Sequence, residues 1–259
     1  MRRVVQVVKL PVDDYLAALQ VALPHFSLRL LLSIVIAAGG SWWLYVPFHE
    51  LAHAFGCIWT GGEVSRLDID PLYGAAMLQQ VFPFINVGSA YAGQLSGFNT
   101  HGNDLIYLVT DAAPFLLSIL VGIPLLRAVP SRRTAMRAAL CLGVALPIAY
   151  APFVALTGDY YEMGSIVVSR LAAPGVAATR LTRWRSDDVM KLASQLFSAD
   201  GGGTWRDALG ISAAFLLGTA GSFATYWLGA RWSDVIARRA RRRQRSRPLD
   251  PSHGITQRS

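Results

Sequence analysis

Charged residues are scarce in this chain. Asp, Glu, Lys and Arg make up 15% of its 259 residues, whereas hydrophobic residues make up 53%. An ordinary soluble domain has about 25% charged residues, and long apolar runs favour an integral membrane protein instead. The sequence contains no internal repeat and no second soluble domain, so we expect residues 1–230 to form a single membrane-embedded domain.

Cysteine is also rare. The two cysteines, Cys57 and Cys141, both lie in apolar segments, so the sequence does not indicate a disulfide framework. Cys57 follows His53 by four residues and would share its helical face. We interpret Cys57 as a small buried residue and not as part of a metal site.

Positive charge is concentrated near the C-terminus. The net charge is +8, and seven arginines stand between Arg238 and Arg247, just after the last apolar segment. Such a juxtamembrane cluster is typical of a cytoplasmic segment that meets anionic lipid headgroups. We therefore predict that residues 231–259 form a basic cytoplasmic tail that binds anionic lipid and not nucleic acid.

Four apolar segments are candidates for membrane spans, at about residues 26–59, 104–127, 134–157 and 207–230. The linker between the second and third contains four arginines, so the positive-inside rule places it in the cytoplasm together with both termini. Residues 158–206 are then expected outside the cytoplasm although they contain six basic residues. Long loops are translocated across the membrane largely independently of their charge. We expect an integral protein of a bacterial cytoplasmic membrane.

Shorter elements complete the expected fold. Residues 1–24 mix basic, acidic and apolar side chains and predict a mature, amphipathic N-terminal segment. Residues 63–70 alternate like a β-strand, and the Gly-rich residues 72–100 could form a re-entrant hairpin or a lid. Residues 186–198 predict a helix. The predicted fold is an α-helical membrane protein with about four transmembrane helices and a short β element after the first.

Two of the five histidines stand four residues apart within the first apolar run. On a helix, His49 and His53 share a face and can offer two nitrogens to one metal ion. Glu50 lies beside them, which gives the His-Glu-x-x-His arrangement in which Zn²⁺ binds the histidines and the Glu deprotonates the metal-bound water. Ionisable side chains in membrane helices are costly and usually functional. The motif therefore predicts zinc-dependent peptide hydrolysis with Glu50 as general base.

A catalytic zinc usually takes three protein ligands and leaves one position open. None of the other three histidines lies in a predicted span, so we expect an acidic third ligand. Asp159 is the first candidate, because it lies at the outer end of the third span, toward which the motif helix runs. Asp111 lies at a depth similar to that of His53, and Glu162 is one helical turn after Asp159. Both remain alternatives.

With these residues the chain resembles the intramembrane zinc metalloproteases of the site-2 protease class, also called the M50 peptidases. In that class His-Glu-x-x-His lies on one membrane helix, and an Asp from a later helix completes the zinc site. The resemblance rests on residues 49–53, on Gly61-Gly62 with the strand that follows, and on residues 157–164. It implies an endopeptidase that cuts membrane proteins within or near the bilayer, with His49, His53 and Asp159 as metal ligands.

The substrate of such an enzyme must be locally unwound, because helical carbonyl groups are already hydrogen-bonded. We predict that the strand at residues 63–70 offers an edge to the extended substrate. Asn86, Asn99 and His101 are candidates for stabilising the oxyanion.

Two alternatives to this function remain open. One is a membrane-anchored zinc protease that uses Glu162 as ligand in a site facing solvent. The other is a noncatalytic membrane scaffold or partner subunit of the same fold, which the intact Glu50 disfavours. Metal content and the effect of Glu50→Gln separate these possibilities. The sequence does not indicate an oligomeric state.

Overall fold

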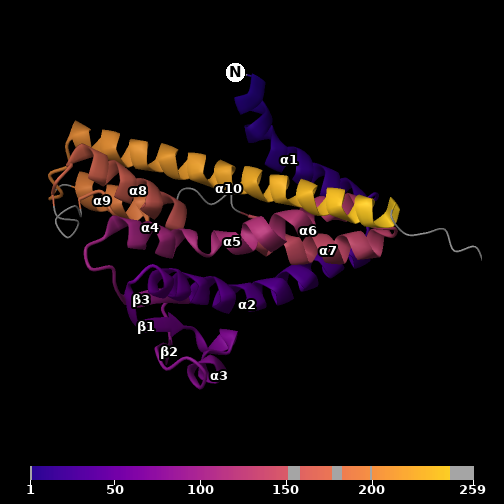
Figure 1. The fold of residues 1–259 in the computed structure, drawn as a ribbon, viewed down its shortest axis with the longest axis horizontal. Coiled ribbons are helices and arrows are strands. Elements are labelled where there is room, and N and C mark those ends of the chain that lie inside the picture. The colour runs from indigo at the N-terminus through magenta and orange to yellow at the C-terminus, as the bar shows by residue number, and fades with distance from the viewer. Residues whose placement is uncertain (1, 151–157, 177–182, 199, 246–259) are drawn as a thin grey trace, which may run out of the picture.

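Helix α2 carries the His-Glu-x-x-His motif and packs against several other elements. The computed structural model describes residues 2–150, 158–176, 183–198 and 200–245. In it, α2 runs without a break from Leu28 to Trp59, as expected for the first apolar segment (Figure 1). Helix α7, Ala135–Ile148, packs along its N-terminal half, and α4, Asp104–Ala112, packs along its C-terminal half.

The second predicted span is a broken helix. Several short elements follow one another: α4, α5 (Phe115–Leu117), the π-helical turn η2 (Ser118–Gly122), α6 (Ile123–Ala128) and the 3₁₀ turn η3 (Val129–Ser131). The path bends by 42° between α4 and α5. Pro114 lies at this bend, where it lacks the N–H that would continue the helical hydrogen bonding.

Within the described part of the chain, two helices are long and apolar enough to cross a membrane, α2 and α10 (Trp205–Arg245), or three if the bent segment counts as one span. Helix α7 has only 14 residues, and the end of the predicted span 134–157 lies outside the described residues. A mostly helical chain with membrane-length helices and a short β element is therefore confirmed. The number of about four spans stays a prediction.

Three longer helices of the described chain also lie outside the predicted spans. They are α1 (Arg2–Ala22) at the N-terminus, α8 (Asp159–Ala172), and α9 (Val189–Phe197) within the predicted helix 186–198. Helix α10 continues through position 230, so the first part of the basic tail is helical. The tail beyond Arg245 lies outside the described residues.

A three-stranded sheet follows α2. Its strands are β1 (Glu63–Ile69), β2 (Ile85–Val87) and β3 (Gly93–Asn99), with η1 (Pro71–Tyr73) and α3 (Ala75–Gln79) between the first two. The strand order is β2-β1-β3, with β1 parallel to β2 and antiparallel to β3. Leu67 and Ile69 of β1 pack on Leu51 and Ala54 of α2, which fixes the sheet beside the motif. The segment predicted as a hairpin or lid thus supplies the two outer strands.

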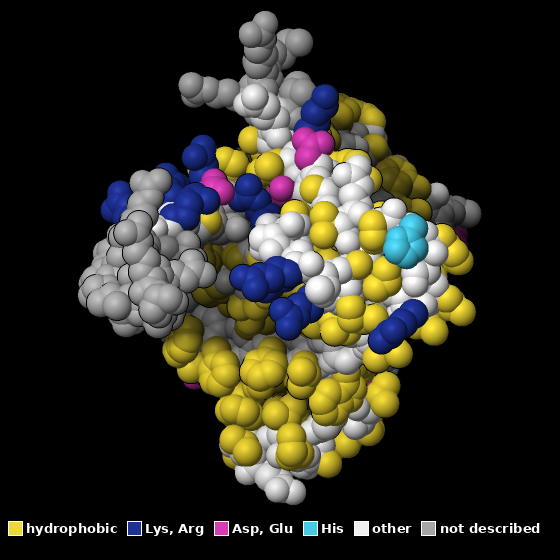
Figure 2. All heavy atoms as spheres, turned by 90° about the vertical axis from the view of Figure 1, so that its right-hand side faces the viewer, with side chains coloured by type: hydrophobic (Ala, Val, Ile, Leu, Met, Phe, Trp, Pro, Cys, Tyr) yellow, Lys and Arg dark blue, Asp and Glu magenta, His cyan; other side chains and the backbone are white. Residues whose placement is uncertain are grey.

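The end of the bundle where α10 finishes is positively charged. Figure 2 views this end and shows Lys and Arg side chains above a broad hydrophobic surface. Arg127 of α6 binds Asp234 of α10 at 3.0 Å and Asp14 of α1 at 3.2 Å, and Tyr226 of α10 donates to Asp14 at 3.0 Å. These contacts hold α6 and α1 beside the C-terminal part of α10. Helices α4 and α8 lie toward the opposite end (Figure 1).

Helices α8 and α10 approach each other closely through glycines. A Cβ atom on Gly164 of α8 would overlap the carbonyl oxygen of Ala214, and one on Gly218 of α10 would overlap the carbonyl oxygen of Tyr160. Because glycine has no side chain at these two positions, the helices can pack at this short distance. Because α8 begins at Asp159, this packing also fixes where that carboxylate lies.

We expect Gly164→Ala to destabilise the protein by about 1–3 kcal/mol, because the helices must separate to admit the methyl group. Gly221→Ala is the matched control, since its Cβ would meet only Tyr160 Cδ1, at 3.7 Å. That variant should gain about 0.5–1 kcal/mol from better helix propensity. Thermal unfolding in detergent measures both, and equal melting temperatures for the two variants would contradict the close contact.

Candidate metal centre

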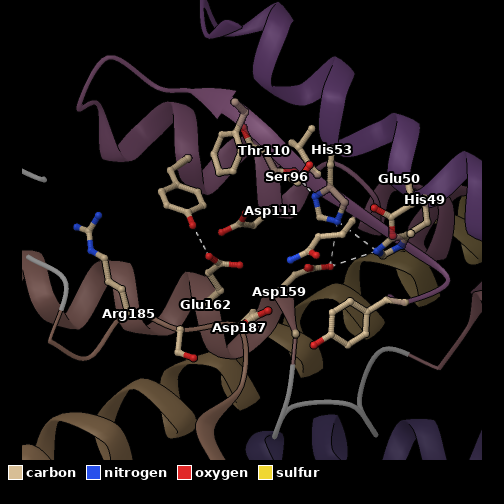
Figure 3. A pocket seen from close by; sticks show the side chains of 18 residues that line it. His49, Glu50, His53, Ser96, Thr110, Asp111, Asp159, Glu162, Arg185 and Asp187 are labelled. Atoms are coloured by element: carbon tan, nitrogen blue, oxygen red, sulfur yellow. Dashed lines mark hydrogen bonds and ion pairs between the residues drawn. The ribbon is translucent and has the colours of Figure 1, made fainter. Parts of the chain in front are cut away.

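Helix α2 presents both histidines of the motif on one face. His49 and His53 are separated by four residues, and their Nε2 atoms lie 3.2 Å apart. Asp159, the first residue of α8, brings its Oδ2 atom to 3.4 Å from His49 Nε2 and 3.5 Å from His53 Nε2. Figure 3 shows the three side chains converging on one point. The structure thus brings together the three residues predicted as metal ligands.

The spacing of these atoms fits a tetrahedral ion. A zinc ion with bonds of about 2.0–2.1 Å holds neighbouring ligand atoms about 3.3–3.4 Å apart, and the three observed separations are 3.2, 3.4 and 3.5 Å. Two imidazole nitrogens and one carboxylate oxygen are also ligands that zinc accepts. No other group of three His, Cys, Asp or Glu side chains in the described part of the chain could hold a metal ion.

Each histidine is oriented by a contact at its second nitrogen. His53 Nδ1 lies 2.8 Å from the carbonyl oxygen of Thr110 in α4, and His49 Nδ1 lies 2.8 Å from the hydroxyl of Tyr45, one turn earlier on α2. A carbonyl oxygen only accepts, so His53 Nδ1 carries a proton and donates it. The Nε2 lone pair of His53 is then free for a metal, as outer-shell partners of metal-binding histidines usually ensure.

Asp159 is positioned by the residue before it. Gly158 has a φ of 79°, in the left-handed region that favours glycine, and its N–H donates to the carbonyl oxygen of Asp187 at 2.5 Å. Tyr160, which directly follows Asp159, stacks on Phe115 with ring centroids 3.9 Å apart. The turn into α8 and this stacked pair together hold the Asp159 carboxylate against α2.

A cavity of about 560 Å³ lies beside the three ligand atoms. It is lined by residues of α2, β3, α4, α8 and the segment before α9. Glu50 borders it next to His49, as Figure 3 shows. A Cβ atom on Gly93 would lie 2.9 Å from Glu50 Cδ, so the absence of a side chain lets β3 run directly against the carboxylate.

The sheet beside the cavity is held by a buried acid. Asp68 of β1 accepts hydrogen bonds from Arg66 at 2.8 Å, from Asn86 of β2 at 2.7 Å and from Ser96 of β3 at 2.5 Å. Burial acts to raise the pKa of Asp68, but these hydrogen bonds and the Arg66 charge outweigh it and lower the pKa below its usual value. The ionised carboxylate therefore cross-links all three strands, including Ser96 at the cavity wall.

The two alternative third ligands line the same cavity but stand apart from the histidines. Glu162 lies one turn after Asp159 and accepts a hydrogen bond from the Tyr107 hydroxyl. Asp111 is 4% exposed, and its Oδ2 atom has no hydrogen-bond partner among the described residues. Neither belongs to the group that could hold a metal ion.

The predicted oxyanion residues lie elsewhere. The structure does not place Asn86, Asn99 or His101 at the cavity. Asn86 is engaged by Asp68, and the Asn99 side chain accepts from the backbone N–H of His101 in an exposed turn. That prediction was wrong because all three were chosen by residue type alone, before their partners in the sheet and turn were known.

Sequence reasoning also missed several residues at the site. Tyr45 and Thr110 orient the histidines, and Gly93 gives β3 its close approach to Glu50. Tyr45 carried a usable signal, because it precedes His49 by one helical turn. Thr110 acts through its backbone carbonyl oxygen, and Gly93 acts because it lacks a side chain. The role of neither residue could be predicted from its side-chain chemistry.

Comparisons with known proteins add no assignment: no family model, no curated protein and no solved structure matches this chain.

Proposed function

We propose that this chain is a zinc-dependent intramembrane endopeptidase of the site-2 protease (M50) type. In this proposal His49, His53 and Asp159 hold Zn²⁺, and Glu50 is the general base. The observation that carries it is the set of three ligand atoms 3.2–3.5 Å apart, with Glu50 on the same helix and a cavity beside them. The site joins residues from α2 and α8 that are more than 100 positions apart in sequence.

The chemistry divides between the ion and the side chains. When bound, zinc lowers the pKa of a water molecule and polarises the scissile carbonyl. Glu50 accepts the proton of the attacking water at a carboxylate oxygen and then returns it to the leaving amine. Its position directly against Gly93 limits how far the carboxylate can turn from the cavity. Thr110 and Tyr45 keep the imidazoles in the required orientation.

An extended substrate would lie along β3. The predicted edge at residues 63–70 is wrong, because β1 is the central strand and pairs with both of its neighbours. Among the described residues, strand β3 pairs with β1 alone, and Gly93, Gln94 and Ser96 line the cavity. Backbone pairing with the outer edge of β3 would hold an unwound segment in extended form beside Glu50.

We further propose about four spans in a bacterial cytoplasmic membrane with both termini in the cytoplasm. Arg127, near the end of α6, binds Asp234 of α10, and Figure 2 shows Lys and Arg side chains gathered at this end of the bundle, which suits a cytoplasmic end under the positive-inside rule. On the opposite side, Arg170 and Arg185 both bind Asp104, and Arg183 binds Asp207. These pairings reduce the positive charge that this topology places outside.

The first test is the metal content of the full-length protein purified in detergent. We expect about one zinc per chain, removal of zinc and of peptide cleavage by a chelator, and return of both when zinc is added. His49→Ala should lose zinc, because two ligands bind more weakly than three. His101→Ala is the matched control, since its side chain is 48% exposed in a turn away from the cavity.

Two results would contradict this proposal in different ways. A folded wild type that takes up no zinc would leave the noncatalytic membrane scaffold as the function. Zinc binding without cleavage of any membrane-spanning test peptide would leave a metal-binding scaffold or partner subunit.

A further inference from the structure

The cavity contains acidic side chains that the proposed chemistry does not use. Asp111 lies in the last turn of α4, 4% exposed, with Oδ2 buried and without a hydrogen-bond partner among the described residues. A buried carboxylate without a donor or counter-charge is strongly unfavourable. Asp111 lines the cavity, so a group entering that cavity could supply the missing partner.

A second carboxylate faces Asp111 from another helix. Glu162 of α8 lines the same cavity, and Figure 3 shows the two carboxylates directed toward each other. Among the described residues, the Glu162 carboxylate accepts a hydrogen bond from the Tyr107 hydroxyl, which gives one donor to the four carboxylate oxygens of the pair. Two carboxylates that face each other across a cavity can hold a cation between them through charge-assisted hydrogen bonds.

The rest of the cavity wall does not supply that cation. Arg185 is the one Lys or Arg in the lining, and its Nη1 atom lies 2.8 Å from Asp104 Oδ1. Arg170 binds the same Asp104 carboxylate at 2.6 Å, and Figure 3 shows the Arg185 guanidinium directed away from Asp111 and Glu162. Asp187 adds a further acidic side chain to the lining. The cavity beside the proposed zinc ligands therefore remains acidic.

A second metal ion fits these residues poorly. The pair offers two carboxylates, whereas zinc takes at least three protein ligands and calcium takes six to eight oxygens. Within the described residues, the group able to hold a metal consists of His49, His53 and Asp159 alone. An ammonium or guanidinium group needs only two carboxylates and satisfies both through charge-assisted hydrogen bonds.

We propose that Asp111 and Glu162 form a subsite for a lysine or arginine side chain of the substrate, close to the bond that is cut. This inference rests on the proposed function, because it places the peptide along β3 and the metal centre. It assigns the enzyme a preference for segments with a basic residue near the cleavage site. Such residues are common where membrane helices end.

The test uses peptide hydroxamates, which bind zinc directly and need no turnover. Each peptide carries norleucine throughout except for one lysine, which is moved stepwise along the chain, and binding to the zinc-loaded protein in detergent is measured by calorimetry. We expect lysine at one position to bind at least about tenfold more tightly than norleucine, and glutamate there to bind more weakly. This comparison is made on the wild type and does not depend on how any variant folds.

The variants then locate the effect. Asp111→Asn and Glu162→Gln should each remove most of the lysine preference while the all-norleucine peptide binds as before. Glu63→Gln is the control for loss of one negative charge, because its side chain is 73% exposed and lies outside the cavity. Asp111→Asn should also leave the melting temperature close to that of the wild type, since it keeps the size of a side chain whose Oδ2 atom has no hydrogen-bond partner among the described residues.

The outcomes separate the two proposals. Hydroxamates that all bind alike to a zinc-containing protein would overturn the subsite and leave the protease. A preference for lysine that persists in both variants would also overturn it. A protein that takes up no zinc and binds no hydroxamate would overturn the protease and the subsite together.

Discussion

Glu50→Gln should lower the rate of peptide cleavage by about 10²–10⁴-fold, the usual contribution of a general base, without changing the zinc content. Glutamine has nearly the same shape, so the close fit of residue 50 against Gly93 is preserved. Its amide cannot accept the proton of the attacking water. Because Glu50 is not among the three grouped ligands, the metal site should remain intact.

The measurement compares cleavage of a membrane-spanning reporter peptide by purified wild type and variant, with zinc measured on the same samples. Glu63→Gln again serves as control, since it makes the same chemical change at an exposed position of β1. Cleavage at the wild-type rate by Glu50→Gln would show that another group acts as base. Loss of zinc from Glu50→Gln would assign Glu50 to the metal site instead.

The motif helix was predictable because its information is local. His49, Glu50 and His53 lie within five residues, and helical periodicity alone places the two histidines on one face. The structure keeps that helix continuous from Leu28 to Trp59. No knowledge of other elements was needed for this part of the candidate site.

The third member of the group could not be chosen from the sequence. Counting depth along straight helices made Asp111 comparable to His53, but α4 ends at a 42° bend. Asp159 starts α8, after a glycine with positive φ, and residues 151–157, the end of the predicted third span, lie outside the described residues. The position of Asp159 depends on the packing of α8 against α4 and α10, and this packing cannot be predicted from the spacing of residues in the sequence.

The sheet was predictable in its first strand only. Residues 63–69 set Val64, Leu67 and Ile69 among polar side chains, which predicts a strand, although the last three residues, Asp68 included, are all buried. Strand β2 has three residues and β3 contains Gly93 and Gly97, so neither shows such a pattern clearly. The strand order follows from long-range pairing, and for that reason β1 was mistaken for an edge.

Asp159→Ala should abolish zinc binding at concentrations that saturate the wild type. Removing even an outer-shell partner of a metal ligand lowers metal affinity by about 10–100-fold. Asp159 Oδ2 lies 3.4 and 3.5 Å from the two histidine nitrogens, which is close to the separation between neighbouring ligand atoms of one zinc ion. The two remaining imidazoles are too few for a stable catalytic site. Competition with a chromogenic chelator measures the affinity.

Asp111→Ala and Glu162→Ala are the matched comparison, because both remove a carboxylate from the same cavity wall. They should retain zinc at close to wild-type affinity, since neither side chain belongs to the group around His49 and His53. Loss of zinc in Glu162→Ala, with retention in Asp159→Ala, would move the metal one turn along α8 and favour a solvent-facing protease. Loss in Asp111→Ala alone would place the third ligand on α4 and would also overturn the subsite for a basic side chain, because Asp111 cannot serve the metal and the substrate together.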